Sequence, residues 1–212
     1  MKKKRPKIKK FYNIPFFGSM EIHAPIPCYV NGAADWLTAN IKGADMWEWG
    51  CGASTLFYAR LAGHVISVEH SPVWHFLIER ELKVLGLDEK VDLKLIEPVL
   101  EESNKYEPRY YTPDSYLSLM LTDDKKVMVL KDYVNSINEN DYKYDFIAID
   151  GRARASCIKQ AVKHIKPGGY ILLDDSERRE YQSAMSEFLP KEPVIEFSSV
   201  ADVQKTTIWR VE

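Results

Sequence analysis

The sequence predicts an α/β fold of the Rossmann-like, doubly wound class, with a mostly parallel sheet and helices on both of its faces. The first observation is the stretch DMWEWGCGAST at 45–55, which has the order of a buried strand, a glycine turn and the start of a helix. The second is an apolar run at 64–69 that ends on an acidic residue. The third is the alternation of short apolar runs with segments of helical spacing along the rest of the chain.

Length and composition fit one such domain. The chain has 212 residues, of which 45% are hydrophobic and 28% charged, so we expect one core at 29–212 behind a basic, lid-like N-terminal segment at 1–28. The net charge of −2 argues against nucleic acid as a partner. Residues 1–10 are nevertheless strongly basic, and we interpret them as a solvated start, with RNA or an anionic membrane as the alternative contact.

Cysteine usage and hydropathy indicate the compartment. Cys28, Cys51 and Cys157 are scattered, so they form neither a disulfide framework nor a metal knuckle. No apolar run reaches the ~20 residues that a membrane span needs. A reducing, cytoplasmic setting is therefore expected.

The turn after the first strand is a candidate cofactor cradle. The strand begins at Asp45, closes on Glu48 and Trp49, and leads through Gly50 and Gly52 into a helix. Glycines there permit dihedral angles that a side chain would forbid, and they let a ligand approach bare amide groups. In the helix that follows, Ser54 or Thr55 can act as the N-cap.

The second strand strengthens this interpretation. It ends in Glu69, 19 positions after Gly50, and this approximates the ~20-residue spacing at which an acid on the second strand of a Rossmann unit reaches ribose hydroxyls. The dinucleotide pattern G-x-G-x-x-G would need a glycine at Thr55, so NAD is disfavoured. Glu48 would also repel a diphosphate, whereas it would accept a cation such as the ammonium group of S-adenosylmethionine.

At this turn the sequence resembles the class I S-adenosylmethionine-dependent methyltransferases, whose first motif is an acidic residue followed by x-G-x-G. The resemblance implies that Glu48 and the glycine loop hold the methionine part of the cofactor and that Glu69 holds the ribose. It also implies that the end of the third strand, at Glu97, lies near the adenine, although a solvated acid is an equal alternative. The candidate cofactor-binding residues are Glu48, Gly50, Cys51, Gly52, Ser54, Thr55, Glu69, His70 and Glu97. For His70 and for His75, a structural role is the favoured alternative.

The remaining elements are expected in this order: helices at 29–41 and 72–86, a strand at 91–96, an insertion at about 98–124, a helix at 126–137, a strand at 146–149, a helix at 155–165, a strand at 170–173, a helix at 177–188, and strands at 194–198 and 206–211. The insertion carries four tyrosines, so it is either a substrate lid or an excursion that covers apolar surface.

The strand at 146–149 ends in Asp150, which makes this residue the best candidate for catalysis. A carboxylate at the carboxyl end of a central parallel strand points into the crevice where such sheets bind ligands. Gly151 provides a sharp turn, and Arg152 and Arg154 follow it. These arginines are candidates to grip a carboxylate, a phosphate or a sugar hydroxyl, and the alternative is that they pair with nearby acids to fasten the loop.

The strand at 170–173 follows a K-P-G-G turn, and such a turn also precedes strand five of the class I methyltransferases. The run I-D-G-R-A-R, with P-G-G and then D-x-S-E-R, resembles a bacterial subgroup of small methyltransferases that modify sugars or natural products. The resemblance covers 45–180. It implies a seven-stranded sheet completed by a C-terminal antiparallel hairpin, which fits the last two predicted strands.

Asp174 and Asp175 end the fifth strand and are expected to face the same crevice as Asp150. The three carboxylates could hold Mg²⁺, in a pattern similar to that of the catechol-type O-methyltransferases. In this chain, Asp175 or Ser176 replaces the asparagine ligand of that family, and Ala153 stands where that family keeps a lysine, which disfavours a lysine-based mechanism. Without a metal, Asp150 could act directly as the general base.

These observations favour an S-adenosylmethionine-dependent O-methyltransferase that acts on a sugar or another small hydroxylated metabolite. One alternative is an RNA methylase, or an inactive nucleic-acid binder, with the basic N-terminal segment as its arm. A second alternative is an NAD-dependent oxidoreductase. The sequence does not determine the oligomeric state, and a homodimer is one option.

Overall fold

The computed structural model describes residues 29, 32–102, 119–121, 126–139, 141–199 and 203–212. The basic N-terminal segment at 1–28 and most of the tyrosine-bearing insertion lie outside the described residues. None of the described helices is long and apolar enough to cross a membrane.

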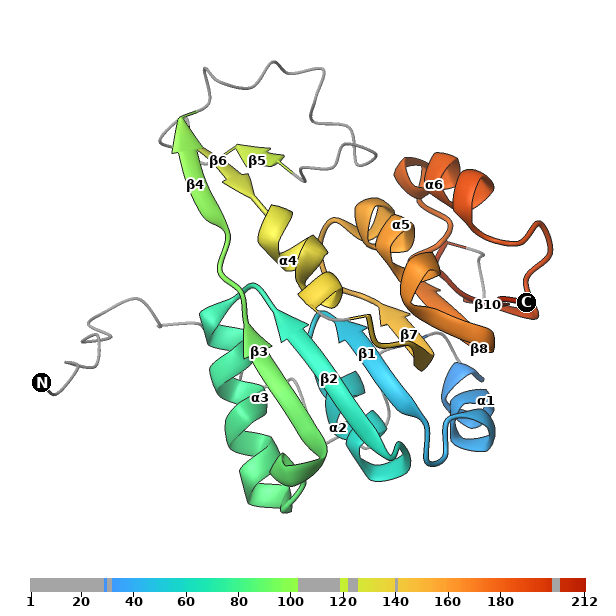
Figure 1. The fold of residues 1–212 in the computed structure, drawn as a ribbon, viewed down its shortest axis with the longest axis horizontal. Helices are drawn as coiled ribbons and strands as arrows, with labels where there is room; N and C mark the ends of the chain where they lie inside the picture. Colours follow the sequence, from blue (N-terminus) through green and yellow to red (C-terminus); the bar gives the residue numbers. More distant parts are fainter. Residues whose placement is uncertain (1–28, 30–31, 103–118, 122–125, 140, 200–202) are drawn as a thin grey trace, which may run out of the picture.

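The core is a seven-stranded sheet with the order β3-β2-β1-β7-β8-β10-β9 (Figure 1). Its strands are β1 (Asp45–Trp49), β2 (His64–Glu69), β3 (Val91–Leu95), β7 (Tyr144–Ile149), β8 (Ile165–Asp174), β9 (Ile195–Ser198) and β10 (Lys205–Arg210). The pairs from β3 to β8 are parallel, whereas β10 is antiparallel to both β8 and β9. The predicted Rossmann-like, doubly wound fold with a C-terminal antiparallel hairpin is confirmed.

Helices cover both faces of this sheet. They are α1 (Ala33–Asn40), α2 (Ala53–Leu61), α3 (Pro72–Leu85), α4 (Lys131–Asn135), α5 (Arg154–His164) and α6 (Gln182–Phe188), with 3-10 turns η1 (Asp88–Lys90), η4 (Ser136–Glu139) and η5 (Arg179–Tyr181). One core cluster joins α1, α2 and α3 to the sheet, and a second joins α4, α5 and α6 to its other face.

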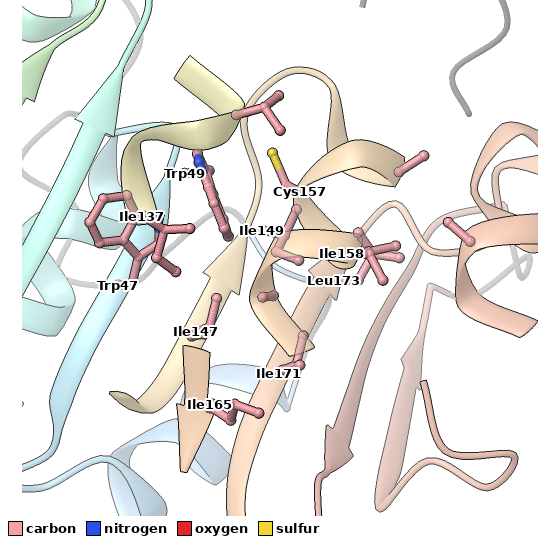
Figure 2. Packing of buried hydrophobic residues seen from close by; sticks show 14 of the residues in the cluster. Trp47, Trp49, Ile137, Ile147, Ile149, Cys157, Ile158, Ile165, Ile171 and Leu173 are labelled. Atoms are coloured by element: carbon pink, nitrogen blue, oxygen red, sulfur yellow. The ribbon is translucent and has the colours of Figure 1, made fainter. Parts of the chain in front are cut away.

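Strand β1 divides its side chains between the two clusters, because successive side chains of a strand point to opposite faces. Trp47 and Trp49 pack in the cluster of α4 and α5, whereas Met46 packs in the cluster of α1, α2 and α3. Figure 2 shows the cluster of α4 and α5, where the two tryptophans lie among isoleucines of the sheet and of α5. Glu48 lies on the same face as Met46, so it is directed toward the start of α2.

The segment between β3 and β7 differs from the prediction. Residues 126–129 form strand β6 (Lys126–Val129) instead of the first turn of a helix, and α4 begins at Lys131. β6 pairs with β4 (Val99–Glu102) and β5 (Leu119–Leu121), which lie in the predicted insertion. This small antiparallel sheet lies beyond the carboxyl end of β3 (Figure 1). The prediction of a helix was wrong here because backbone pairing with β4 and β5 decides the conformation of a short apolar run.

Smaller differences concern element ends. α1 begins at Ala33, and α6 begins at Gln182 after the 3-10 turn η5. The K-P-G-G turn lies inside β8, where the pairing with β7 jumps from Ile165 to Tyr170. Trp209, at 3% exposure, packs in the core as expected.

Candidate functional site

The predicted site residues come together where β1, β2, β7 and β8 end. The turn after β1 lies between the turns after β2 and β7, since β1 pairs with both strands. The carboxyl ends of parallel strands meet at one edge of the sheet, which is where open α/β sheets bind ligands. Glu48, Glu69, Asp150 and Asp174 all lie at or next to this edge.

Gly50 brings the turns after β1 and β7 into direct contact. It has φ +94°, and a Cβ on it would lie 2.5 Å from the Cα of Gly151. The Gly50 amide donates to the Val68 carbonyl at 2.9 Å, and the Asp150 amide donates to the Trp49 carbonyl at 3.0 Å. Gly50 therefore packs two loops against each other, which is a tighter constraint than the sequence indicates.

Gly52 has the opposite environment. Its backbone is extended, and among the described residues a Cβ built on it would have only the hydroxyl oxygen of Ser54 within 4 Å, at 3.9 Å. The Gly52 amide donates to Thr55 Oγ1 at 3.0 Å. Space next to the main chain is thus available at Gly52, as a cradle for a ligand requires.

Glu48 is fully buried beneath the turn. Its Oε1 accepts a hydrogen bond from Ser54 (2.5 Å), and its Oε2 accepts hydrogen bonds from Thr55 (2.6 Å) and Ser67 (2.6 Å). Burial raises the pKa of Glu48 to about 7, although the three hydroxyls oppose this shift. The carboxylate therefore fastens the start of α2 to β2.

Glu69 joins the turn after β2 to the glycine turn, and it is 3% exposed. Its Oε2 accepts from the Cys51 amide at 3.0 Å, and its Oε1 accepts from the amides of His70 (2.9 Å) and Ser71 (2.7 Å). The His70 ring contacts the ring of Tyr133 in a T-shaped arrangement, with the centroids 5.7 Å apart. The spacing argument thus placed Glu69 correctly beside the glycine turn.

The other candidates around the turn divide into two groups. Ser54 and Thr55 are buried, and their hydroxyls donate hydrogen bonds to Glu48. Cys51 is also buried, and its thiol pKa is raised by burial and then by the charges of Glu69 and Glu48. Glu97 is exposed. The Ile96 amide next to it donates to the Glu69 carbonyl at 2.8 Å, so the end of β3 approaches the site although the Glu97 side chain is open to solvent.

Asp150 lies at the end of β7 with 27% of its side chain exposed. Its Oδ1 accepts from Arg154 Nη2 at 2.9 Å. Burial and then the negative charge of Asp174 raise the pKa of Asp150, while the guanidinium of Arg154 opposes both effects. Asp150 is therefore a carboxyl group with increased basicity at the mouth of the crevice, as a general base requires.

The two arginines of the loop have different environments. Arg154 is buried and donates to the main-chain carbonyls of Asp150 (2.8 Å), Gly151 (3.1 Å) and Asp174. Arg152 is exposed. The alternative of fastening the loop therefore describes Arg154, and Arg152 remains the candidate for contact with a substrate.

The predicted Mg²⁺ site does not fit the structure. The guanidinium of Arg154 lies among Asp150, Asp174 and Asp175, the three proposed ligands, at 2.9 to 3.7 Å from their carboxylate oxygens. Asp174 Oδ1 also accepts from Thr206 at 2.6 Å. Within the described ranges, no three His, Cys, Asp or Glu side chains are arranged to hold a metal ion. The three carboxylates thus already have cations of the protein as partners, because Arg154 contacts all three and Arg178 also contacts Asp175.

Sequence analysis missed three participants. Tyr29 and Tyr58 place their hydroxyls 2.6 Å apart, and the charges of Glu48 and Asp150 add to burial in raising the pKa of both phenols. Ser67 lies directly opposite Glu48 in the β1–β2 register. A sequence indication exists only for Tyr58, which follows Thr55 by one helical turn; the others depend on long-range contacts.

Comparisons with known proteins were made by sequence and by structure. No protein-family model and no curated protein matches the sequence. A putative rRNA methylase from Clostridium thermocellum matches the structure with a TM-score of 0.56 and 14% identity, over 84% of this chain and 93% of that one. An S-adenosylmethionine-dependent O-methyltransferase from Thermotoga maritima matches with a TM-score of 0.55 and 15% identity, over 84% of this chain and 64% of that one.

A putative methyltransferase from Streptococcus mutans, solved in complex with S-adenosylhomocysteine, matches with a TM-score of 0.54 and 11% identity, over 84% of this chain and 94% of that one. Identities this low establish the architecture only. The strand order and these likenesses agree, and the chain therefore has the fold of the class I S-adenosylmethionine-dependent methyltransferases.

Proposed function

We propose that this protein is an S-adenosylmethionine-dependent methyltransferase that methylates an oxygen atom of a small hydroxylated metabolite or sugar. The observation that carries the proposal is the open glycine turn at Gly52, which lies between the buried carboxylates of Glu48 and Glu69 at the carboxyl edge of the sheet. Carboxylates around a glycine turn attract a positively charged nucleoside and repel a diphosphate. The fold supports the same assignment.

The residues present fit this cofactor. The turn at Gly50 and Gly52 would receive the methionine part, the charge of Glu48 would attract its ammonium group, and Glu69 would receive the ribose. When bound, the cofactor supplies a methyl group that is activated by its attachment to a sulfonium, so that a bond from carbon to the acceptor oxygen forms as the carbon–sulfur bond breaks. The protein must then orient the acceptor and remove one proton from it.

Asp150 is the group that we assign to proton removal. Its carboxyl group is partly exposed at the crevice, and its raised pKa favours proton uptake near neutral pH. Arg152 is exposed on the same loop and would contact a polar or anionic part of the acceptor. Cys51 and Cys157 are both buried as free thiols, which supports placing the reaction in the reducing cytoplasm.

Replacing Gly52 with arginine is expected to weaken S-adenosylmethionine binding at least a hundredfold while the protein stays folded. The extended backbone accepts any residue, but the new side chain fills the cradle and brings a positive charge to a site for a cation. Isothermal titration calorimetry measures the affinity. Gly86→Arg is the control for an added arginine, because Gly86 follows α3 at the opposite edge of the sheet and no described residue has an atom within 4 Å of its Cβ position. Its φ of +66° strains this variant, so the two variants are compared by affinity at a temperature at which both are folded. Unchanged affinity in Gly52→Arg would refute the proposed cofactor site.

Replacing Asp150 with asparagine is expected to leave S-adenosylmethionine affinity within about threefold and to lower methyl transfer at least a hundredfold, because an amide cannot accept the proton. The measurement is release of S-adenosylhomocysteine with a panel of sugar and phenolic hydroxyl acceptors. Arg152→Gln is the companion variant, and it should raise KM more than it lowers kcat. Full turnover by Asp150→Asn would place the acceptor elsewhere.

An RNA acceptor is the alternative that the matched rRNA methylase suggests. It predicts RNA binding that weakens steeply with salt and is lost when residues 1–10 are deleted. An NAD-dependent oxidoreductase predicts that NAD, and not S-adenosylmethionine, raises the melting temperature. Measuring the melting temperature with NAD and with S-adenosylmethionine therefore distinguishes an oxidoreductase from a methyltransferase.

A further inference from the structure

Arg154 occupies the point at which three acidic side chains of the crevice converge. Its Nη2 lies 2.9 Å from Asp150 Oδ1, and its Nη1 lies 3.2 Å from Asp175 Oδ2 and 3.7 Å from Asp174 Oδ2. Nε donates to the Gly151 carbonyl, and the two Nη atoms also donate to the carbonyls of Asp150 and Asp174. The guanidinium is therefore held from the ends of both β7 and β8.

The geometry leaves Arg154 little freedom to contact an acceptor. A guanidinium has five N–H groups, and the three carbonyls, Asp150 Oδ1 and Asp175 Oδ2 together account for that number of partners. The side chain is 10% exposed. It can act on the reaction only through the acids that it touches.

We propose that the guanidinium of Arg154 is a built-in cation which takes the place of a divalent metal in this crevice, so that methyl transfer here is metal-independent and relies on Asp150 as positioned by Arg154. This inference rests on the proposed methyltransferase function. In the step that it describes, the O–H bond of the acceptor breaks and its proton passes to a carboxylate oxygen of Asp150. The electron pair left on the acceptor oxygen forms the bond to the methyl carbon. No metal-bound hydroxyl is needed.

The charges around the site support this assignment. Asp150, Asp174 and Asp175 would repel one another strongly without a neighbouring cation, because buried like charges are costly. Their proximity raises the pKa of the Arg154 guanidinium even though burial lowers it, and the same guanidinium opposes the upward pKa shifts of Asp150 and Asp174. Arg154 thus limits the rise in the pKa of Asp150 that burial and Asp174 cause, and in this way it favours the carboxylate form. We call it a positioning residue because its contacts are with Asp150 and its neighbours.

The first test uses Mn²⁺ alone and does not depend on the cofactor. Electron paramagnetic resonance counts free Mn²⁺ in the presence of the full chain. We expect wild type and Asp150→Asn to bind Mn²⁺ equally weakly, because the guanidinium excludes the ion from the acids. Stoichiometric binding by wild type that is lost in Asp150→Asn would overturn the proposal.

The second test removes the cation. Arg154→Met is expected to bind Mn²⁺ at least tenfold more tightly than wild type, because the carboxylates of Asp150 and Asp174 would lose their arginine, while Asp175 would keep its contact with Arg178. Arg154→Lys retains a positive charge, is less disruptive to folding, and should stay within about threefold of wild type. Arg152→Met, which removes an exposed arginine from the same loop, should not change Mn²⁺ binding. No gain in a folded Arg154→Met variant would show that the acids do not converge, and would overturn the proposal.

The third test concerns the pH profile of S-adenosylhomocysteine release. Arg154→Lys is expected to keep S-adenosylmethionine affinity and to shift the acidic limb of the profile, which reports ionisation of the general base Asp150, toward higher pH, because a lysine holds fewer of the acids. A purely structural Arg154 would change stability without moving this limb. EDTA should leave wild-type turnover unchanged. If EDTA inhibited turnover and added Mg²⁺ restored it, the proposal would be overturned. Failure of S-adenosylmethionine to bind at all would refute the proposed function and leave the Mn²⁺ results to decide the role of Arg154.

Discussion

Replacing Gly50 with alanine is expected to lower the free energy of unfolding by about 3 kcal/mol or more and to abolish S-adenosylmethionine binding. Gly50 has φ +94°, which an alanine adopts only with strain. The new Cβ would also lie 2.5 Å from Gly151 Cα and 2.6 Å from Gly151 N. Backbone atoms on both sides cannot yield as a flexible side chain would, so the loops after β1 and β7 must separate.

A matched control separates strain from steric clash. Gly43 also has a positive φ, of +74°, but a Cβ on it would have no atom within 4 Å. Gly43→Ala should therefore cost only about 1 kcal/mol, the strain alone, and leave the site intact. Urea unfolding of wild type and of both variants gives the loss in free energy of unfolding for each substitution. Equal costs at Gly50 and Gly43 would show that the contact between the two loops does not constrain the fold.

The comparison between Gly50 and Gly52 shows what sequence reasoning could and could not provide. Local spacing placed Gly50, Gly52 and Glu69 in one site, because a strand, a tight turn and a second strand with a terminal acid are adjacent in the chain. The two glycines appear equivalent in the sequence. Only the parallel pairing of β1 with β7, about 100 residues apart, shows that Gly50 is a packing contact and that Gly52 is open.

The strands of the main sheet were predictable for a related reason. Most are short apolar runs that are largely buried, such as 64–69 and 144–149. In the sequence, a turn or a helical segment precedes and follows each of these runs. The run at 126–129 was assigned to a helix because its apolar spacing fits either conformation. Its pairing with strands at 99–102 and 119–121 decides the outcome; the second of these strands is close in sequence, but the first is separated from 126–129 by the long insertion.

The predicted Mg²⁺ site was wrong because the identities of the three acidic residues do not show which other side chain lies among them. Asp150, Asp174 and Asp175 do gather at one edge, as the topology argument required. The sequence indicates that Arg154 contacts a ligand or pairs with nearby acids to fasten the loop, but it does not show that these acids are the three candidate metal ligands. Its position depends on β7 and β8 being neighbours, which brings residues 20 positions apart into contact.

The pH dependence of stability should identify Glu48 as a costly ionised group. Its pKa is about 7 in the folded protein and about 4.5 when solvated, so between these values the folded state binds more protons than the unfolded state. The free energy of unfolding then falls as pH rises from about 5 to 8, by about 3 kcal/mol at most. Glu48→Gln should remove this fall, because its amide can pair with Ser54, Thr55 and Ser67 without carrying a charge.

We therefore expect Glu48→Gln to match wild type in stability at pH 5 and to exceed it by about 2 kcal/mol at pH 8. All other ionisable groups are common to the two proteins, so the difference between the two unfolding curves isolates Glu48. Parallel curves for the two proteins across this range would contradict the assigned pKa shift.

A buried charge that lowers stability needs a reason to be retained, and a cationic ligand at the turn provides one. Wild type should bind S-adenosylmethionine more tightly at pH 8 than at pH 6, because ionised Glu48 attracts the ammonium group. Glu48→Gln should bind it about tenfold more weakly at pH 8 and show little change with pH, as measured by calorimetry. If the variant gained stability at pH 8 and kept the full affinity, Glu48 would serve only to fasten α2 to β2, and the negative potential at the turn would have to come from Glu69 alone.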